Sequence, residues 1–287
     1  MRAKESRTSS DAPSGLRKAR AKHAAKKPRS PRIAEIPGID PDAQPLAPAR
    51  SPDDALRSRA GAIFDRLAVA HADARCALEH HGPFELLVMT ILSAQCTDET
   101  VNRVAPALFA KYPDARAMAA AKPQDVMAII KPTGFFRAKA NNIIGASRAL
   151  VERHDGSVPR GMAELTLLPG VGRKTANIVR GNAFGLPGMG VDTHVRRLSQ
   201  RMALTRSDDP VVIEGDLCAI WPAERWTMGT HYLIFHGRRV CQARSPKCEV
   251  CVVQDLCPSA AKFLKARRAV PHAIRGKTGA RPKRSAR

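Results

Sequence analysis

The stretch "ELTLLPGVGRKTANIVRGNAFG", which runs from Glu164 to Gly185, decides the fold of this chain. Apolar residues end a short helix near Leu167, and a second helix starts near Val171. Between the two helices, the Pro169–Gly170 pair makes a tight turn. This pattern predicts a helix-hairpin-helix motif, although a plain helical hairpin would have the same turn.

The glycines of this turn favour an anion site. Gly170 and Gly172 let backbone N–H groups point outward at the positive end of the second helix. Such a site suits a DNA phosphate, which it holds without reading a base. We therefore expect Gly170, Gly172 and the adjoining Arg173 to contact DNA.

Lys174 follows directly, on the first turn of the second helix. At about 100° per residue it lies about 60° from Val171, on the border between the apolar and polar faces. Partial burial at that border and the positive helix end both favour the neutral amine. A neutral amine is a nucleophile for Schiff-base chemistry, whereas a plain exposed lysine would only hold a phosphate.

Asp192 is the candidate partner of this lysine. The helix from about Gly172 to Phe184 rises ~20 Å, and the loop Gly185–Gly190 can return at most ~20 Å. Asp192 can therefore lie beside Lys174, where a carboxylate takes the proton of the amine or stabilises a developing cation. The alternative is that Asp192 only caps the helix that follows it, and both roles are compatible.

Four of the seven cysteines lie in one window, "CQARSPKCEVCVVQDLC", as Cys241-x6-Cys248-x2-Cys251-x5-Cys257. We find no export signal, so disulfides are disfavoured. Four thiolates suit Zn²⁺ or a four-iron cluster. Zinc ribbons usually have two CxxC pairs and only one is present, so the uneven spacing favours [4Fe–4S].

The loop between the first two of these cysteines is basic, with Arg244 and Lys247. A cluster that clamps this loop could present both charges to DNA phosphates. A purely structural role of the cluster is the alternative, and it is compatible with that contact.

The net charge of +22 is concentrated at the two ends of the chain. Residues 1–52 contribute +7 and residues 262–287 contribute +10, and both segments have almost no large apolar residues. Such segments are expected to be disordered basic arms that lie along a polyanion, with solubilising tails as the alternative.

The residues between the arms predict an all-α protein of about ten helices joined by Pro/Gly turns. Residues 83–95 read as a buried helix, and residues 98–112 as an amphipathic one that Pro106 interrupts. The longest apolar stretch, "LLVMTIL" from Leu86, is too short to span a membrane. We expect a cytoplasmic, nucleoid-associated protein, with a transit peptide left open by the Arg/Ser-rich N-terminus.

Three quoted stretches precede the four-cysteine tail: "LLVMTILSAQCTDETVN", "LPGVGRKTAN" and "GVDTHVRR". In this order the chain resembles the endonuclease III family of bifunctional DNA glycosylases with AP-lyase activity. The resemblance implies a helix-hairpin-helix glycosylase fold with a six-helix barrel domain and a cluster domain. The expected segments are a basic arm (1–52), the start of the cluster domain (53–77), the barrel with the hairpin (78–186), the rest of the cluster domain (187–261) and a basic tail (262–287).

The resemblance also implies roles for single residues. Lys174 would be the nucleophile, Asp192 its acidic partner, and the four clustered cysteines the ligands of [4Fe–4S]. Gln95 matches a glutamine that the family inserts into DNA, and Phe135 lies where a related enzyme commonly places a leucine wedge, with core packing as the alternative. His194 would contact the DNA backbone, unless it is only part of the helix-capping surface.

The implied protein is a monomeric base excision repair enzyme that acts on double-stranded DNA. It would release oxidised pyrimidines and cleave 3′ to the abasic site by β-elimination. One alternative is a mismatch adenine glycosylase, which also carries the cluster but generally lacks the lysine and has a further C-terminal domain. The other is a non-catalytic iron–sulfur DNA-binding regulator, which needs no pair of Lys174 and Asp192.

Overall fold

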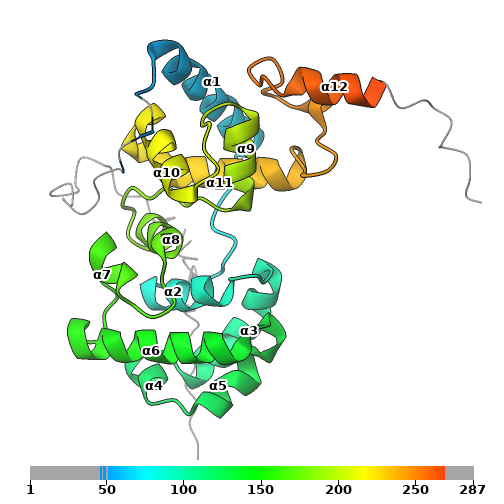
Figure 1. Ribbon diagram of the computed structural model, residues 1–287. Helices are drawn as coiled ribbons and strands as arrows, with labels where there is room; N and C mark the ends of the chain where they lie inside the picture. Colours follow the sequence, from blue (N-terminus) through cyan, green and yellow to red (C-terminus); the bar gives the residue numbers. More distant parts are fainter. Residues whose placement is uncertain (1–45, 47, 50, 269–287) are drawn as a thin grey trace, which may run out of the picture. The chain divides into compact units, whose positions relative to one another are not determined.

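The computed structural model describes residues 46, 48, 49 and 51–268. Within these residues it contains helices and no strand, so the all-α prediction is confirmed (Figure 1). The α-helices are α1 (Asp54–Ala70), α2 (Pro83–Leu92), α3 (Asp98–Lys111), α4 (Ala115–Ala119), α5 (Pro123–Ile130), α6 (Phe136–His154), α7 (Met162–Thr166), α8 (Arg173–Ala183), α9 (Thr193–Arg201), α10 (Pro210–Ile220), α11 (Trp226–Arg239) and α12 (Ala260–Arg268). Short 3₁₀ helices occur at Lys131–Thr133, Ala223–Arg225 and Cys248–Val250.

Local sequence signals explain most helix starts. Asp53 caps α1 by accepting a hydrogen bond from the backbone N–H of Leu56, and Thr97 caps α3 in the same way. The interruption expected at Pro106 is wrong, because α3 continues through it to Lys111. Pro106 is exposed, so solvent can reach the backbone group that its missing N–H leaves unpaired.

The buried apolar side chains form two clusters. The first draws on residues 78–179, and within it α6 lies against α4 and α5 (Figure 1). The second combines Ala60, Ile63 and Leu67 of α1 with residues 189–253. The start of the described chain therefore packs with its later part, because α1 needs α10 and α11 to cover its apolar face.

Helix α8 connects the two clusters. A Cβ atom on Gly181 would lie 2.5 Å from Oγ1 of Thr227 in α11, so only glycine permits this approach. One residue later, the side chain of Asn182 is hydrogen-bonded to Nε2 of His231 at 2.7 Å. The helix that follows the hairpin turn is therefore held firmly against the second cluster.

The expected arms lie mostly outside the described residues, which exclude 1–45 and 269–287. At the C-terminal end, α12 runs to Arg268, whereas we expected disorder from Lys262 onward. At the N-terminal end, the backbone N–H of Ala49 donates to Asp216 at 2.9 Å. The helix and this hydrogen bond both involve residues that we expected to belong to the disordered arms.

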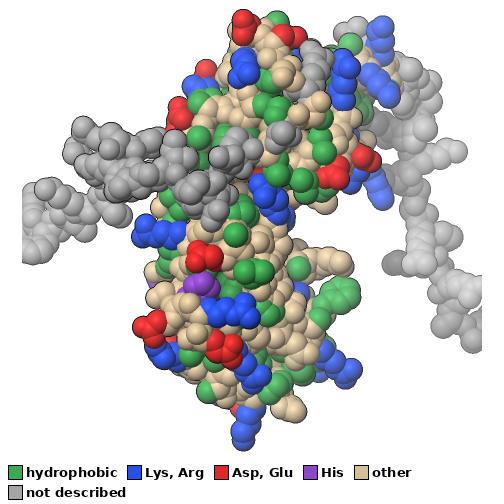
Figure 2. Space-filling model, turned by 60° about the vertical axis from the view of Figure 1, so that its left-hand side comes forward, with side chains coloured by type: hydrophobic (Ala, Val, Ile, Leu, Met, Phe, Trp, Pro, Cys, Tyr) green, Lys and Arg blue, Asp and Glu red, His purple; other side chains and the backbone are tan. Residues whose placement is uncertain are grey.

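Charges are mixed on the surface of the described part. On the face in Figure 2, Lys and Arg side chains lie singly or in small groups among Asp and Glu. Exposed ion pairs such as Arg66–Asp255 and Lys111–Asp125 belong to this pattern. None of the helices in the described residues has both the length and the apolar character required to cross a membrane.

Candidate active site and cysteine pocket

The hairpin turn between α7 and α8 has the conformation that its glycines allow. Gly170 has a φ of +77°, and a Cβ atom there would lie 2.8 Å from the Cβ atom of Asn142. Gly172 is the N-cap of α8, is exposed, and has nothing within 4 Å of the position of a Cβ atom. No side chain caps this helix start, so its first N–H groups face open space and can bind an anion.

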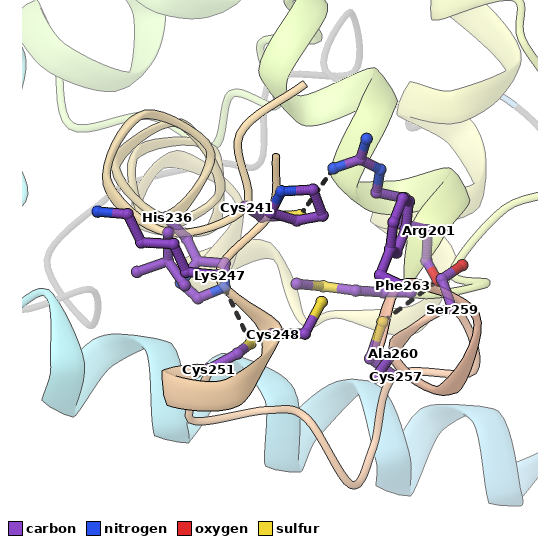
Figure 3. Close-up of a pocket in the computed structure, with 13 residues that line it drawn as sticks. Arg201, His236, Cys241, Lys247, Cys248, Cys251, Cys257, Ser259, Ala260 and Phe263 are labelled. Carbon is purple, nitrogen blue, oxygen red and sulfur yellow. Dashed lines mark hydrogen bonds between the residues drawn. The ribbon is translucent and has the colours of Figure 1, made fainter. Parts of the chain in front are cut away.

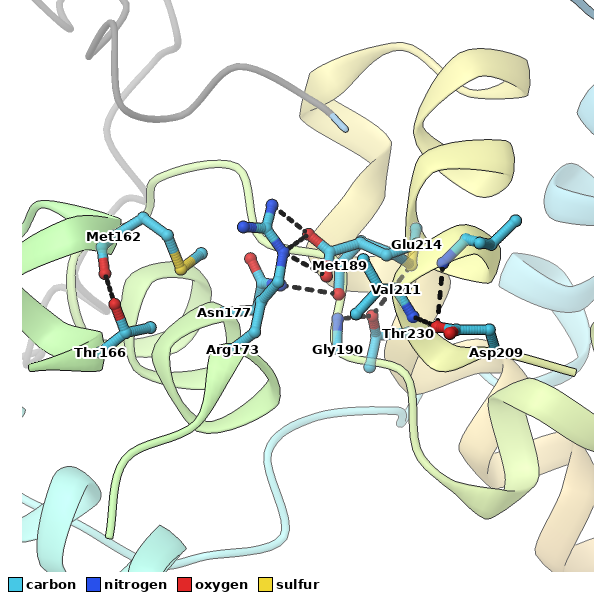
Figure 4. A network of polar contacts seen from close by, with 11 residues as sticks. Met162, Thr166, Arg173, Asn177, Met189, Gly190, Asp209, Val211, Glu214 and Thr230 are labelled. Atoms are coloured by element: carbon cyan, nitrogen blue, oxygen red, sulfur yellow. Dashed lines mark hydrogen bonds and ion pairs between the residues drawn. The ribbon is translucent and has the colours of Figure 1, made fainter. Parts of the chain in front are cut away.

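Arg173 is held by a neighbouring helix. Its Nε atom donates to both carboxylate oxygens of Glu214 in α10, at 3.0 and 2.9 Å, and its Nη2 atom lies 2.9 Å from one of them (Figure 4). The side chain of Glu214 is only 8% exposed. Arg173, which we expected to contact DNA, is therefore occupied in a bidentate ion pair that ties the hairpin to α10.

This ion pair leads to a stability prediction. We expect Arg173→Ala to lower the free energy of unfolding by about 2 kcal/mol, because it leaves the Glu214 carboxylate buried without its partner. Adding Glu214→Leu to that variant should recover most of the loss, since no buried charge then remains. Chemical denaturation of the three proteins measures both effects, and a double variant less stable than Arg173→Ala would contradict the explanation.

Lys174 is exposed on the first turn of α8. The partial burial that we expected for it is wrong, because its position on the border of the helix faces the open side of the hairpin. In the described part of the chain, no ion pair or hydrogen bond immobilises the amine of Lys174. The amine is therefore accessible from the same side as the free N–H groups of the turn.

The loop that follows α8 returns along it in the opposite direction. A Cβ atom on Gly188 would lie 2.3 Å from the carbonyl oxygen of Asn177, and one on Gly190 would lie 2.8 Å from Cδ1 of Ile178. The side chain of Asn177 donates to the carbonyl of Met189 at 3.0 Å (Figure 4). The loop is thus pressed against the middle of α8, and Asp192 follows two residues after its contact with Ile178.

Asp192 follows two residues after Gly190 and is half-buried. Its Oδ1 atom accepts hydrogen bonds from the backbone N–H groups of His194 and Val195, both at 2.8 Å, so it caps α9. In the described residues no hydrogen bond or ion pair joins Asp192 to Lys174. Oδ1 therefore serves as the cap, and Oδ2 takes no part in these capping hydrogen bonds.

His194 packs against α11. Its Nδ1 atom accepts from Arg197 at 3.1 Å, and a Cβ atom on Gly237 would lie 2.8 Å from it. Burial lowers the pKa of His194, the nearby Asp192 carboxylate opposes this, and Arg197 and Arg238 add to it. The ring is therefore mainly neutral near pH 7 and is partly a packing residue.

Two of the expected DNA-inserting residues have unusual backbones. Gln95, just after α2, has a φ of +52°, and Phe135, just before α6, has a φ of +48°. Such left-handed conformations cost about 1–3 kcal/mol for residues other than glycine and often occur at functional sites. Both side chains are exposed, and the Phe135 ring is 66% exposed, so the core-packing alternative for Phe135 is wrong.

Lys139 was missed by sequence reasoning. Its side chain is only 4% exposed, and its ammonium donates to the carbonyl of Thr133 at 2.8 Å. Burial lowers the pKa of this amine. This hydrogen bond supports the loop that carries Phe135. In the sequence, the burial of Lys139 could have been inferred from its helical spacing with the apolar residues Phe136 and Ile143.

The four clustered cysteines line one pocket at the end of α11 (Figure 3). In a [4Fe–4S] cluster each iron binds one protein thiolate, so the four sulfurs stand apart around it. Four soft donors around one pocket fit an iron–sulfur cluster.

Two cationic side chains support this pocket. Nη1 of Arg201 donates to the sulfur of Cys241 at 3.3 Å, and Arg197 donates to the carbonyl of Cys241 through Nε and Nη2. Arg244 and Lys247, in the loop between Cys241 and Cys248, are exposed. Their positions leave both charges accessible to a polyanion.

The pocket resists ionisation of free thiols. Burial raises the pKa of Cys251 to about 11, and it also raises the pKa values of Cys248 and Cys257. Neighbouring cysteines add to each shift. Iron bound here would supply the positive charge that four thiolates in one place need.

A hairpin anion site, an accessible lysine, a returning aspartate and a cysteine pocket define a class of DNA repair protein. Residues 88–223 match the HhH-GPD superfamily of base excision DNA repair proteins, and residues 241–257 match the iron–sulfur binding domain of endonuclease III. The chain belongs to the endonuclease III family. Its all-α fold and its [4Fe–4S] cofactor are those of that family.

Relatives support this assignment along most of the folded part. The chain is 53% identical to "Endonuclease III" of Synechocystis sp. over 205 residues, which cover 71% of this chain and 94% of the relative. It is 40% identical to "Endonuclease III" of Escherichia coli K12 over 195 residues, which cover 68% of this chain and 92% of that protein.

Solved structures agree with the sequence relatives. The "Structure of a non-covalent Endonuclease III-DNA Complex" matches with a TM-score of 0.70 and 42% identity, over 73% of this chain and 98% of that one. A "Trapped Endonuclease III-DNA Covalent Intermediate" matches with a TM-score of 0.70 and 41% identity, over 72% and 98%. The protein is an enzyme of base excision repair, a bifunctional DNA glycosylase and AP lyase that removes oxidised pyrimidines.

Proposed function

We propose that Lys174 is the nucleophile of this enzyme. Its amine is exposed beside the free N–H groups at the start of α8, where a DNA phosphate can bind. That phosphate would place the neighbouring sugar within reach of the amine. This juxtaposition of an anion site and an accessible amine on one helical turn is the observation that carries the proposal.

The reaction needs one neutral amine and one group that handles protons. The neutral Nζ atom of Lys174 attacks C1′ of the extruded nucleotide, and the bond between C1′ and the base breaks. The sugar ring then opens to a Schiff base, which acidifies the C2′ proton. Loss of that proton expels the 3′ phosphate, and the strand is cut by β-elimination.

Asp192 is the acidic partner in this scheme. Two observations support this role: the loop before Asp192 packs against α8, the helix that carries Lys174, and one carboxylate oxygen of Asp192 is not used by the cap. It takes the proton of the attacking amine and stabilises the cation that develops on the sugar.

The remaining contacts position DNA. Gly170 and Gly172 form the phosphate site, and exposed Gln95 and Phe135 enter the space of the extruded base. His194 adds a contact to the backbone next to Asp192. Arg173 contributes indirectly, because its ion pair with Glu214 holds the hairpin in place.

Cys241, Cys248, Cys251 and Cys257 are the proposed ligands of the cluster. Their arrangement around one pocket at the end of α11 supports this assignment. The cluster would hold the exposed loop from Cys241 to Cys248 so that Arg244 and Lys247 meet DNA phosphates.

Several wider assignments follow the same lines. The two buried clusters support a division into a barrel domain of residues 78–186 and a cluster domain of residues 53–77 and 187–261. We further propose a monomer that acts on double-stranded chromosomal DNA in the cytoplasm. The basic ends of the chain would add affinity without selectivity, since their charges neutralise phosphates.

We expect the purified protein to release oxidised pyrimidines, such as thymine glycol, from duplex DNA and to cut the abasic product. The test is a cleavage assay on duplexes that each contain one defined lesion. The matched control is a duplex with adenine opposite 8-oxoguanine, the substrate expected of a mismatch adenine glycosylase. We expect this adenine to stay in the duplex. Adenine release without strand cutting would contradict the proposal.

We expect the protein to be brown and to contain near-stoichiometric iron and sulfide after anaerobic purification. Cys248→Ala should lower the folded yield and cluster content more than it alters the chemistry of the protein that survives, since the cluster contributes mainly to folding. Metal analysis and the visible absorption band measure both. Cys218→Ala is the control, because this buried cysteine lies outside the pocket. Zinc in place of iron in the wild-type protein would contradict the ligand assignment.

A further inference from the structure

Two buried histidines lead away from the cysteine pocket. Nε2 of His236, in α11, lies 3.3 Å from the sulfur of Cys251. The other ring nitrogen of His236, Nδ1, lies 3.0 Å from Nε2 of His71, which follows α1. His236 is 1% exposed and His71 is 4% exposed, so water contributes little to either ring.

We propose that His71 acts as a positioning residue that makes His236 donate an N–H···S hydrogen bond to Cys251 and thereby raises the reduction potential of the cluster. The inference rests on the proposed role of Cys251 as a cluster ligand. A ligating sulfur is a thiolate, which has lone pairs and no proton to donate. Hydrogen bonds to cluster sulfurs stabilise the reduced, more negative state.

The tautomers follow from hydrogen-bond accounting. Buried neutral imidazole has one N–H and one lone pair. If the proton of His236 were on Nδ1, its Nε2 lone pair would face the lone pairs of the Cys251 thiolate. The proton of His71 would then be on Nδ1, where it would be a buried donor.

The surroundings of Nδ1 of His71 decide between the two tautomer arrangements. Nδ1 of His71 is buried and has no hydrogen-bond partner in the described part of the chain. An unpaired buried N–H costs more than an unpaired lone pair, which is the state left in the other arrangement. In that arrangement His71 Nε2–H donates to His236, and His236 Nε2–H donates to Cys251.

The test compares two substitutions of His71 in the full-length holoenzyme. His71→Leu removes the donor, so His236 loses its fixed tautomer. The equilibrium constant for reduction of the cluster should then fall about tenfold. For a one-electron couple this lowers the midpoint potential by about 59 mV. His71→Gln keeps an amide N–H near the position of Nε2 and should keep the wild-type potential.

The matched control is His231→Leu. His231 is also buried on α11, but its ring bonds to Asn182 rather than to the pocket, so the potential should not change. An unchanged potential in fully loaded His71→Leu would overturn the proposal. If the midpoint potential of His71→Gln fell as far as that of His71→Leu, the proposal would also be overturned, because the change would then reflect packing and not the N–H donor.

A measurement on the wild-type protein makes the proposal independent of how the variants fold. Pulsed EPR of the paramagnetic, one-electron-reduced cluster in ¹⁵N-histidine-labelled protein should detect one coupled ring nitrogen, and its absence would overturn the hydrogen bond. Iron and sulfide analysis of Cys251→Ala tests separately the assumption that Cys251 is a cluster ligand. Full cluster content in that variant would show that Cys251 is no ligand, and the inference would fail with it.

Discussion

Lys174→Ala is expected to abolish both the covalent adduct and the strand cut. Borohydride should trap the wild-type protein on duplex DNA that contains an abasic site or an oxidised pyrimidine, because the Schiff base is reduced to a stable amine. Without the Nζ amine no Schiff base can form, so the trapped band should vanish. Binding to abasic DNA should persist, because the phosphate is held by backbone N–H groups that the substitution does not remove.

Lys122→Ala is the matched control for this experiment. Lys122 is also an exposed lysine at a helix start, since it occupies the N-cap position of α5, but it lies outside the hairpin. Its substitution should leave trapping and cutting at the wild-type level. If Lys174→Ala trapped and cut at the wild-type rate, the amine would belong to another residue and the turn would be only a phosphate site.

Asp192→Asn is expected to slow base release by a factor on the order of 10²–10⁴, the usual contribution of a positioned acid–base group. Asparagine accepts the same hydrogen bonds from the start of α9 as aspartate does, and the two are about equal as N-caps. The variant therefore removes the negative charge and keeps the cap. Single-turnover kinetics on one oxidised pyrimidine measure the loss.

Asp192→Ala separates the two roles of this residue. It removes the cap as well as the charge, so it should also lower the free energy of unfolding by about 1 kcal/mol. Thermal unfolding should rank the wild type with Asp192→Asn and place Asp192→Ala below them. Wild-type kinetics in Asp192→Asn would leave Asp192 as a cap and nothing more.

The sequence was most informative where function depends on local geometry. The hairpin turn depends on glycines at Gly170 and Gly172, and the pocket depends on four cysteines within seventeen residues, so both were visible as short motifs. The role of Asp192 as an N-cap was also visible, because it directly precedes a helical stripe. Pro106 misled the prediction, since one exposed proline does not end a helix that packing supports on its other side.

Residues whose roles depend on distant partners could not be read in the same way. The prediction that Arg173 contacts DNA rests on its place beside the turn, whereas its ion pair with Glu214, 41 residues away, could not be read from the sequence. Lys139 was not singled out in the sequence, and only the fold shows that its amine supports the Phe135 loop. Burial and long-range pairing are properties of packing, which periodicity alone does not contain.

By itself, therefore, the sequence determined an all-α chain with a glycine hairpin turn, a lysine on its second helix and four cysteines close together in the chain. Each of these depends on residue types at short spacing, which local backbone geometry converts directly into structure. Only the tertiary structure decided that Lys174 is exposed, that Arg173 pairs with Glu214, and that His71 meets His236 beside Cys251. The physical reason is that these contacts join segments far apart in the chain, and their existence depends on how whole helices pack.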